Sequence, residues 1–294
     1  MSTTPKSTLH NDRLPMTLPA LAEKKRRGEA IVMVTAYDHP SAQIAEAAGV
    51  DIVLVGDSGA MTVLGYPSTV AVSVDEMLML ASAARRGCRT PLLVGDLPFG
   101  SYEVSDEQAV QTAQRFVKEA GCDAVKLERG DPASVSRARA IVASGIPVMG
   151  HLGLTPQTAT ALGGYRAQSR TADQALAMAA AAFDLEAAGC FAIVLEAIPA
   201  AVAAALSPRL AIPLIGIGAG PATDGQVLVF HDLLGIYDGH TPRFAKRYAA
   251  LREQMVAAVS EYADDVRGRR FPAAEHTYSI DPGELDAFTE GIRA

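Results

Sequence analysis

The chain has 294 residues, of which 49% are hydrophobic and 20% charged, and its formal net charge is −7. This length fits one large α/β domain or two smaller ones, and the composition is typical of a globular protein. The acidic balance argues against a nucleic-acid partner, which would require clustered lysine and arginine. Glycine, proline or charged residues interrupt every apolar run, so we also expect no membrane partner.

The cysteines and the N-terminal sequence together predict a cytoplasmic location. Cys88, Cys122 and Cys190 are far apart and form no metal-binding or redox spacing. We therefore expect them to be buried free thiols in a reducing compartment. The first 15 residues lack the apolar segment of a secretion signal.

Eight short apolar runs recur along the chain, and Ala-rich helical segments separate many of them. The runs lie at 31–38, 51–58, 91–98, 123–130, 147–154, 191–198, 213–220 and 227–235. Continuous apolar runs are typical of parallel strands that are covered on both faces. The pattern predicts an α/β fold with a single (β/α)₈ barrel. An open doubly wound sheet is the main alternative, although no GxGxxG motif opens the first helix.

The clearest predicted helices cover 73–87, 105–121 and 171–189. The first two begin with serine followed by acidic residues, which suits a helix N-terminus and its dipole. All three end at glycine, the common residue at a helix C-terminus. Each predicted helix is therefore bounded by recognisable start and stop signals.

We divide the chain into an N-terminal arm at 1–20, a catalytic barrel at 21–264 and a polar C-terminal extension at 265–294. Two connections within the barrel, 59–71 and 155–171, are rich in Gly, Thr and Ser and longer than usual βα loops. Long loops after strands are where a barrel keeps lids and binding segments.

Polar residues end most of the apolar runs, and in a barrel they would all emerge on the C-terminal face, which carries the chemistry. The final residues are Asp38, Asp57, Asp96, Glu128, His151, Glu196, Gly218 and Asp232. An aspartate after a strand is commonly the N-cap of the next helix, which explains Asp38 and Asp232 well. His151 is open to two interpretations, a site residue or a core histidine bonded to a carbonyl.

Asp57, Asp96 and Glu128 call for a functional explanation, because three successive strands deliver a carboxylate to one place. Like charges so placed would destabilise the fold unless a cation joined them, and oxygen ligands suit Mg²⁺ best. Lys126 lies two residues before Glu128, so it faces the same side and could hold a substrate carboxylate. Glu196, on the sixth run, is a candidate general base, with a helix cap or ion pair as the alternative. Together these residues indicate a barrel enzyme that uses Mg²⁺ to stabilise an enolate of a small oxyacid.

From about residue 30 to about 250 the sequence resembles the ketopantoate hydroxymethyltransferase family. The matching motifs are VTAYD, LVGDS, GDLPFGSYE, VKLE, GHLGLTPQ, LGGYRAQSR, VLEAIP, IGIGAGPATDGQVLVFHDLLG and HTPRFAKRY. The resemblance implies a (β/α)₈ barrel that assembles as a homo-oligomer, a pentamer or a decamer. It also implies transfer of a hydroxymethyl group from 5,10-methylenetetrahydrofolate to 3-methyl-2-oxobutanoate, which gives 2-dehydropantoate (ketopantoate) in pantothenate synthesis.

The resemblance also assigns roles to individual residues. It implies Mg²⁺ ligands at Asp57, Asp96 and Glu128, and substrate contacts at Asp57, Ser58, Asp96 and Lys126. The general base would be Glu196. We add His151 as a further candidate for substrate binding.

The sequence departs from the usual family pattern in three motifs without losing a predicted ligand or the base. It reads GDSGAM for GDSLGM, VKLERG for VKIEGG, and GGYRAQS for GGYKVQG or GGYRVQG. One alternative is a Mg²⁺-dependent lyase or mutase of the phosphoenolpyruvate mutase and isocitrate lyase group, but no cysteine here has the context of that group's catalytic cysteine. The other alternative is a non-catalytic barrel that binds keto acids.

Overall fold

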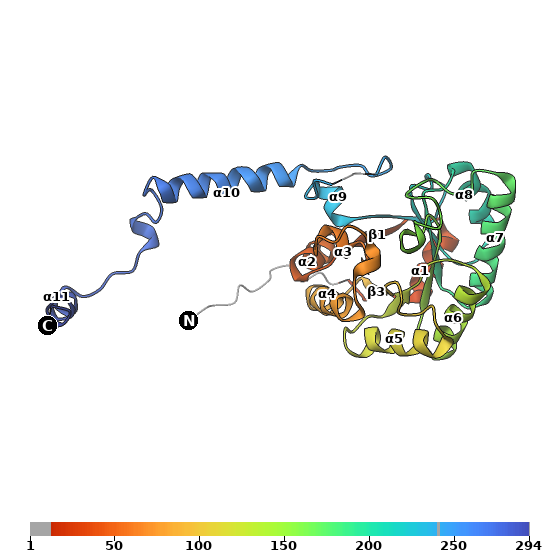
Figure 1. The fold of residues 1–294 in the computed structure, drawn as a ribbon, viewed down its shortest axis with the longest axis horizontal. Helices are drawn as coiled ribbons and strands as arrows, with labels where there is room; N and C mark the ends of the chain where they lie inside the picture. Colours follow the sequence, from red (N-terminus) through yellow and green to blue (C-terminus); the bar gives the residue numbers. More distant parts are fainter. Residues whose placement is uncertain (1–12, 240–241, 294) are drawn as a thin grey trace. The chain divides into compact units, whose positions relative to one another are not determined.

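The computed structural model of the chain describes residues 13–239 and 242–293. Eight parallel strands form a closed barrel in chain order, and β8 returns to pair with β1, where Val32 lies opposite Gln226. This confirms the predicted (β/α)₈ barrel over the open sheet (Figure 1). The strands are β1 (Ile31–Thr35), β2 (Ile52–Val55), β3 (Leu92–Asp96), β4 (Ala124–Lys126), β5 (Val148–Gly153), β6 (Ala192–Glu196), β7 (Leu214–Ile217) and β8 (Gly225–Leu228).

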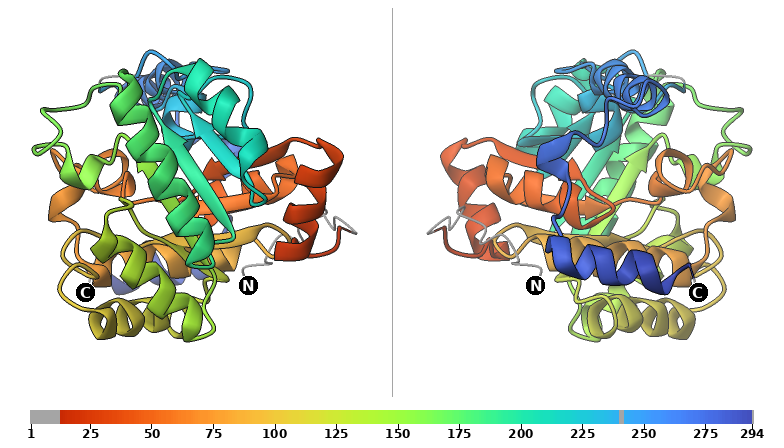
Figure 2. Two further views of the ribbon diagram at one scale, coloured as in Figure 1. Left: turned by 90° about the vertical axis from the view of Figure 1, so that its right-hand side faces the viewer. Right: turned by 90° about the vertical axis from the view of Figure 1, so that its left-hand side faces the viewer.

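Helices lie on the outside of the strands (Figure 2). They are α1 (Leu18–Arg27), α2 (His39–Ala48), α3 (Gly59–Thr62), α4 (Val74–Gly87), α5 (Asp106–Lys118), α6 (Pro132–Ala143), α7 (Ala172–Ala187), α8 (Ala200–Leu206) and α9 (Phe230–Leu234). Ser73, Ser105 and Thr171 cap α4, α5 and α7 by accepting a backbone hydrogen bond, which confirms the three predicted starts. Asp38 caps α2 in the same way, as predicted.

The bounds of the eighth strand were predicted wrongly. The apolar run 227–235 is not one strand, because β8 ends at Leu228 and residues 230–234 form α9. The chain turns at this point because the backbone N–H of Phe230 donates to Oγ1 of Thr35 on the neighbouring β1, at 2.9 Å. Asp232 consequently lies in the first turn of α9, whose N-cap is Val229, so the interpretation of Asp232 as a helix N-cap was wrong.

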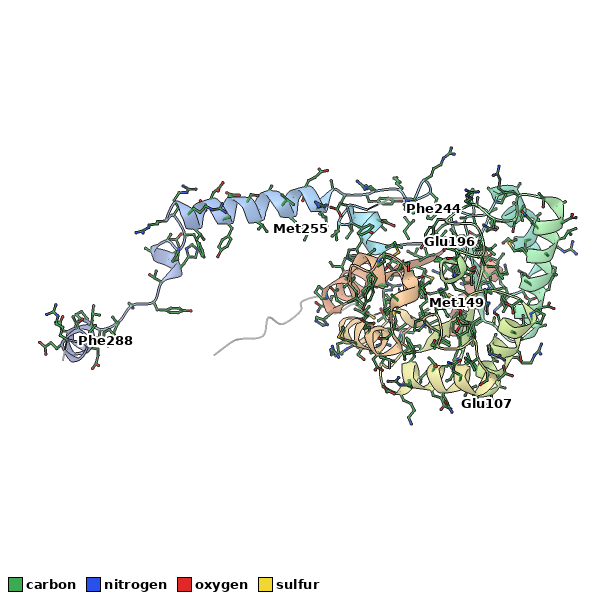
Figure 3. All side chains as sticks on the ribbon, viewed as in Figure 1. Glu107, Met149, Glu196, Phe244, Met255 and Phe288 are labelled. Atoms are coloured by element: carbon green, nitrogen blue, oxygen red, sulfur yellow. The ribbon has the colours of Figure 1, made fainter. Side chains whose placement is uncertain are left out.

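Side chains alternate strictly along the strands, and this divides the core into two layers. Residues such as Ile52, Leu54 and Met149 fill the barrel interior, whereas Val53 and Leu93 pack outward against the helices. Strands β2 and β3 are buried at every position, as expected for parallel strands covered on both faces. Figure 3 shows Met149 within the barrel and Glu107 at its outer surface.

The chain divides into two compact units, Met1–Tyr248 and Ala249–Ala294. The second unit contains α10 (Leu251–Arg267), a 3-10 turn at Ala274–His276 and α11 (Pro282–Gly291), and none of these elements has a buried residue. The predicted barrel end at 264 falls inside α10, and much of the predicted arm at 1–20 lies outside the described residues. Both domain boundaries stay predictions.

A smaller expectation, which concerns the cysteines, also has an outcome. Cys88, Cys122 and Cys190 are free and buried, and burial raises the pKa of the Cys190 thiol to about 12. Among the described residues, no helix is both long and apolar enough to cross a membrane.

Candidate active site

The alternation of side chains in the barrel explains why the predicted residues share one place. On β3, Leu92 and Val94 point to the interior, so Asp96 does as well. On β4, Ala124 points to the interior, so the same alternation places Lys126 and then Glu128 in the mouth of the barrel. The strand register sets Lys126 directly beside Asp96.

His151 and Glu196 reach the mouth by the same rule, two residues after Met149 and Val194 respectively. Asp57 and Ser58 follow β2 at the turn into α3. All seven predicted residues line one cavity of about 910 Å³ at the C-terminal end of the barrel. The structure therefore brings together every residue that the sequence singled out for the site.

The acidic side of the cavity is crowded and almost fully buried. Nζ of Lys126 lies 2.7 Å from Oδ1 of Asp96, and the backbone N–H of Asp57 donates to Oδ2 of Asp96 at 3.2 Å. Burial, together with the charges of Asp96 and Glu128, raises the pKa of Asp57 well above its usual range. Burial alone would lower the pKa of Lys126, but these three carboxylates outweigh burial and raise it, so the ammonium stays charged.

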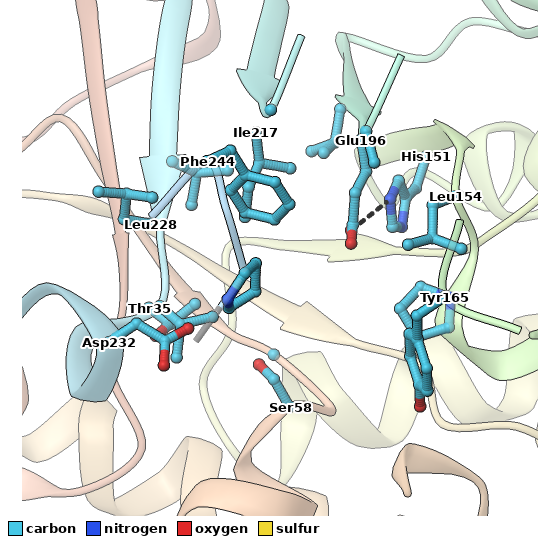
Figure 4. A pocket seen from close by; sticks show the side chains of 18 of the residues that line it. Thr35, Ser58, His151, Leu154, Tyr165, Glu196, Ile217, Leu228, Asp232 and Phe244 are labelled. Atoms are coloured by element: carbon cyan, nitrogen blue, oxygen red, sulfur yellow. Dashed lines mark ion pairs between the residues drawn. The ribbon is translucent and has the colours of Figure 1, made fainter. Parts of the chain in front are cut away.

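His151 connects this acidic side to Glu196. Its Nδ1 lies 3.4 Å from Oε1 of Glu128 and 3.3 Å from Nζ of Lys126, and its Nε2 lies 3.2 Å from Oε2 of Glu196 (Figure 4). Burial and the charge of Lys126 lower the pKa of His151, but the two carboxylates raise it overall, to about 9. The ring therefore lies between two acids, and its raised pKa favours the charged form. Within the part of the chain that the structure describes, the ring contacts side chains, as a site residue does, and not a backbone carbonyl.

The rest of the cavity is wider and more apolar. Figure 4 shows Phe244 and Leu228 on one side and Tyr165 on the other, with Glu196 and His151 between them. Tyr165 belongs to the long connection 155–171, and Met61 and Thr69 come from the other long connection, 59–71. Both long connections thus supply the cavity wall, at the position where barrels carry binding segments.

The residues that follow Glu128 and Glu196 have unusual backbone geometry. Arg129 has φ 74° and Ala197 has φ 48°, and both values lie in the left-handed region, which a residue with a Cβ adopts at a cost. The chain therefore leaves the barrel abruptly after each of these acids. This turn leaves both carboxylates at the wall of the cavity.

Sequence analysis missed three residues that hold the site. The Tyr37 hydroxyl lies 2.8 Å from Oγ of Ser58, Tyr102 donates to the side chain of Gln157 at 2.6 Å, and Gln157 contacts both Asp57 and Glu128. All three lie inside the motifs VTAYD, GDLPFGSYE and GHLGLTPQ. The signal in the sequence that could have identified each of them was a polar residue within a motif that is buried in the fold.

The departure at Gly59 also has a structural reason. A Cβ at this position would lie 2.7 Å from Cδ1 of Tyr37, which is too close for an ordinary contact. Gly59 therefore allows the buried ring of Tyr37 to reach Ser58.

The carboxylates in the cavity are the kind of ligand that a hard divalent cation prefers, although they are not arranged as a complete binding site for one. Among residues 13–239 and 242–293, no three His, Cys, Asp or Glu side chains converge as a ready-made metal site. The three buried carboxylates of Asp57, Asp96 and Glu128 nevertheless outnumber Lys126, and Oε1 of Glu128 is buried without a hydrogen bond. A buried excess of negative charge with oxygen donors is the environment that a hard divalent cation would stabilise.

The fold and the site together define a barrel enzyme that acts on a small acid, with charged residues gathered at the C-terminal mouth. The chain belongs to the ketopantoate hydroxymethyltransferase family, whose model matches residues 15–274. The 3-methyl-2-oxobutanoate hydroxymethyltransferase of Moorella thermoacetica is 54% identical over 266 residues, which cover 90% of this chain and 98% of that protein. The mitochondrial 3-methyl-2-oxobutanoate hydroxymethyltransferase 1 of Arabidopsis thaliana is 49% identical over 300 residues, covering 98% of this chain and 86% of that protein.

Solved structures of similar fold are more distant in sequence. A phosphonopyruvate hydrolase in complex with oxalate and Mg²⁺ has a TM-score of 0.58 at 14% identity, with 95% of this chain and 96% of that chain covered. A 2,3-dimethylmalate lyase of the phosphoenolpyruvate mutase and isocitrate lyase superfamily has a TM-score of 0.56 at 17% identity, with 94% and 96% covered. These similarities show the fold alone, so the lyase alternative from the sequence is matched in architecture only.

Proposed function

We propose that the protein uses this cavity to transfer a hydroxymethyl group from 5,10-methylenetetrahydrofolate to 3-methyl-2-oxobutanoate, giving 2-dehydropantoate. Family membership at about 50% identity supports the overall reaction. The observation that carries the proposal is the convergence, in one cavity, of three carboxylates and Lys126 with the separate carboxylate of Glu196. One side of the cavity is suited to bind an oxyacid, and the other side is suited to accept a proton.

In the proposed reaction, Glu196 removes the proton from C3 of the keto acid. C3 then forms a carbon–carbon bond with the one-carbon unit, and one water supplies the hydroxyl group as the bonds from that carbon to the two folate nitrogens break. The departing tetrahydrofolate takes up the proton held by Glu196 and the second proton of the water. A carboxylate is a weak base for such a carbon acid, so the charge that develops on the keto oxygen must be stabilised. When bound by Asp57, Asp96 and Glu128, Mg²⁺ would supply that positive charge.

The remaining residues bind and orient the keto acid. The Lys126 ammonium is held at 2.7 Å from Asp96 and faces the cavity, where it can pair with the substrate carboxylate. Ser58, held by Tyr37, offers a hydroxyl group beside it. Nε2 of His151 lies 3.2 Å from Oε2 of Glu196, and this contact keeps the general base aimed across the cavity.

The wider proposal concerns assembly and location. We propose a homo-oligomer, a pentamer or a decamer, in the cytoplasm, with neither nucleic acid nor membrane as a partner. Exposed apolar side chains in the second unit, among them Met255, Val259 and Phe288, support self-association. The three buried free thiols suit a reducing compartment.

One assay tests the proposed reaction. Purified protein with Mg²⁺, 3-methyl-2-oxobutanoate and 5,10-methylenetetrahydrofolate should form 2-dehydropantoate, detected by NMR. A reaction without enzyme measures the background, because the one-carbon donor can release formaldehyde. Product formation no faster than this background would overturn the proposal and favour a non-catalytic barrel.

A further inference from the structure

Gln157 joins two of the acidic residues to the long connection 155–171. It lies in the 3-10 turn Pro156–Thr158 and is buried. Its backbone N–H donates to Oε2 of Glu128 at 3.1 Å, and its side-chain amide donates to Oδ2 of Asp57 at 3.0 Å. One residue therefore contacts carboxylates that come from the ends of two different strands.

The amide group of Gln157 has only one orientation that satisfies its neighbours. The Tyr102 hydroxyl donates to Oε1 of Gln157 at 2.6 Å, while accepting a hydrogen bond from the backbone N–H of Glu128 at 3.3 Å. The second amide proton goes to the carbonyl oxygen of Leu97 at 2.9 Å. If the amide were reversed, its oxygen would face the carbonyl oxygen of Leu97 and the carboxylate of Asp57. Neither group can donate a hydrogen bond to that oxygen when Asp57 is ionised.

These hydrogen bonds leave particular oxygen atoms available. Gln157 engages Oδ2 of Asp57 and Oε2 of Glu128. The other oxygen of Glu128, Oε1, is buried and makes no hydrogen bond, with Nδ1 of His151 3.4 Å away. A carboxylate held through one oxygen, with the other presented to the site, is how neighbouring residues commonly orient metal ligands.

We propose that Gln157 is a positioning residue for the cation site, and that Tyr102 acts through it. This inference rests on the proposed role of Asp57 and Glu128 as ligands. Gln157 presents one oxygen of each carboxylate to the cation. Because Gln157 belongs to the same connection as Tyr165, it also ties the placement of the cavity wall to the acidic residues.

The test measures Mn²⁺ binding to the full-length, metal-free protein by electron paramagnetic resonance. Gln157→Leu keeps a similar volume and the backbone N–H that donates to Glu128, but it removes the side-chain donors to Asp57 and to Leu97, and it should weaken Mn²⁺ binding by about 10- to 100-fold. Tyr102→Phe removes the hydroxyl that orients the amide and that also accepts from the backbone N–H of Glu128, and it should weaken binding less because the amide itself stays. The double variant should be no weaker than Gln157→Leu, because residues that act in one network are not additive.

A matched control separates this role from a general effect of the substitution. Gln114→Leu makes the same change on the exposed surface of α5 and should leave Mn²⁺ binding at the wild-type value. Thermal unfolding of each variant, followed by circular dichroism, shows whether the barrel is intact.

A second readout is exchange of the C3 proton of the keto acid in D₂O, followed by NMR as a function of Mn²⁺ concentration. In Gln157→Leu the Mn²⁺ concentration for half-maximal exchange should rise, and saturating Mn²⁺ should restore the rate. A residue that only supports the fold, or that itself contacts the substrate, would give a loss that Mn²⁺ does not restore.

The outcomes are distinguishable. Wild-type protein that binds no Mn²⁺ would overturn the cation site itself, and the inference with it. Wild-type binding that Asp57→Asn abolishes but Gln157→Leu leaves unchanged would overturn the inference alone. If Gln157→Leu does not fold, Tyr102→Phe decides: weakened Mn²⁺ binding supports the inference, and unchanged binding overturns it.

Discussion

The two sides of the barrel mouth differ in how their carboxylates are held. On the side formed by β2, β3 and β4, the carboxylates are buried and held by hydrogen bonds. On the β6 side, the side chain of Glu196 is 16% exposed. Asp57, Asp96 and Glu128 accept hydrogen bonds from the backbone or from Gln157. The Glu196 carboxylate lies 3.2 Å from the ring of His151.

This difference suits the two sides to different chemical roles, ligand binding and proton transfer. A group that binds a charged ligand is most effective when it is already in place, because no reorganisation is then needed during the reaction. A group that accepts and returns a proton needs access to the substrate and a moderate affinity for that proton. The buried side of the mouth is therefore interpreted as the binding side, and the more open side as the proton-transfer side.

The largest expected effect follows from replacing Glu196, the proposed general base. Glu196→Gln should lower the rate of C3 proton exchange by about 10²- to 10⁴-fold, the usual contribution of a general base. Binding of the keto acid, measured by calorimetry in the presence of Mg²⁺, should stay nearly unchanged because the binding side is untouched. Glu107→Gln on the outer surface is the control. Exchange at the wild-type rate would show that another group removes the proton.

The next effect concerns the stability of the buried side. Lys126→Met leaves Asp96 buried without its ion-pair partner, and it should lower the free energy of unfolding by about 3–5 kcal/mol, measured by urea denaturation. Arg115→Met is the control, because Arg115 pairs with Asp75 and Glu119 at the surface, and such pairs contribute about 0–1 kcal/mol. Equal losses in the two variants would show that the buried pair of Lys126 and Asp96 contributes no more stability than a surface pair.

The smallest effect tests the connection between the two sides. His151→Asn removes the ring that lies between Glu128 and Glu196, and C3 exchange should fall by about tenfold, or about 1.4 kcal/mol. Affinity for the keto acid should change little, because His151 acts on the orientation of Glu196. A larger loss of affinity than of rate would instead assign His151 to substrate binding, as the sequence first suggested.

The barrel could be predicted from the sequence because its signals are local. Serine caps, glycine stops and continuous apolar runs each reflect the physics of a single segment, and most of them were correct. The run 227–235 was predicted wrongly because a short apolar run does not distinguish a strand from a buried helix. The hydrogen bond from Phe230 to Thr35 decides the outcome there, and its partners are far apart in the sequence.

The candidate site was predictable for the same reason, but only in part. Asp96, Lys126 and Glu128 lie at strand ends, where the period of two tells which way a side chain points. Gln157 and Tyr102 lie in loops, where no period applies and a polar residue is ordinary. Only the folded chain shows that Gln157 reaches Asp57, a hundred residues earlier in the sequence.

The alternation along β4 limits how this protein can change by insertion or deletion. Adding or removing one residue within Ala124–Lys126 would exchange the two faces of the strand end, so that Leu127 would point into the mouth in place of Lys126 or Glu128. The connections 59–71 and 155–171 carry no such constraint on length. Homologues with altered specificity should therefore vary in loop length while keeping the length of their barrel strands.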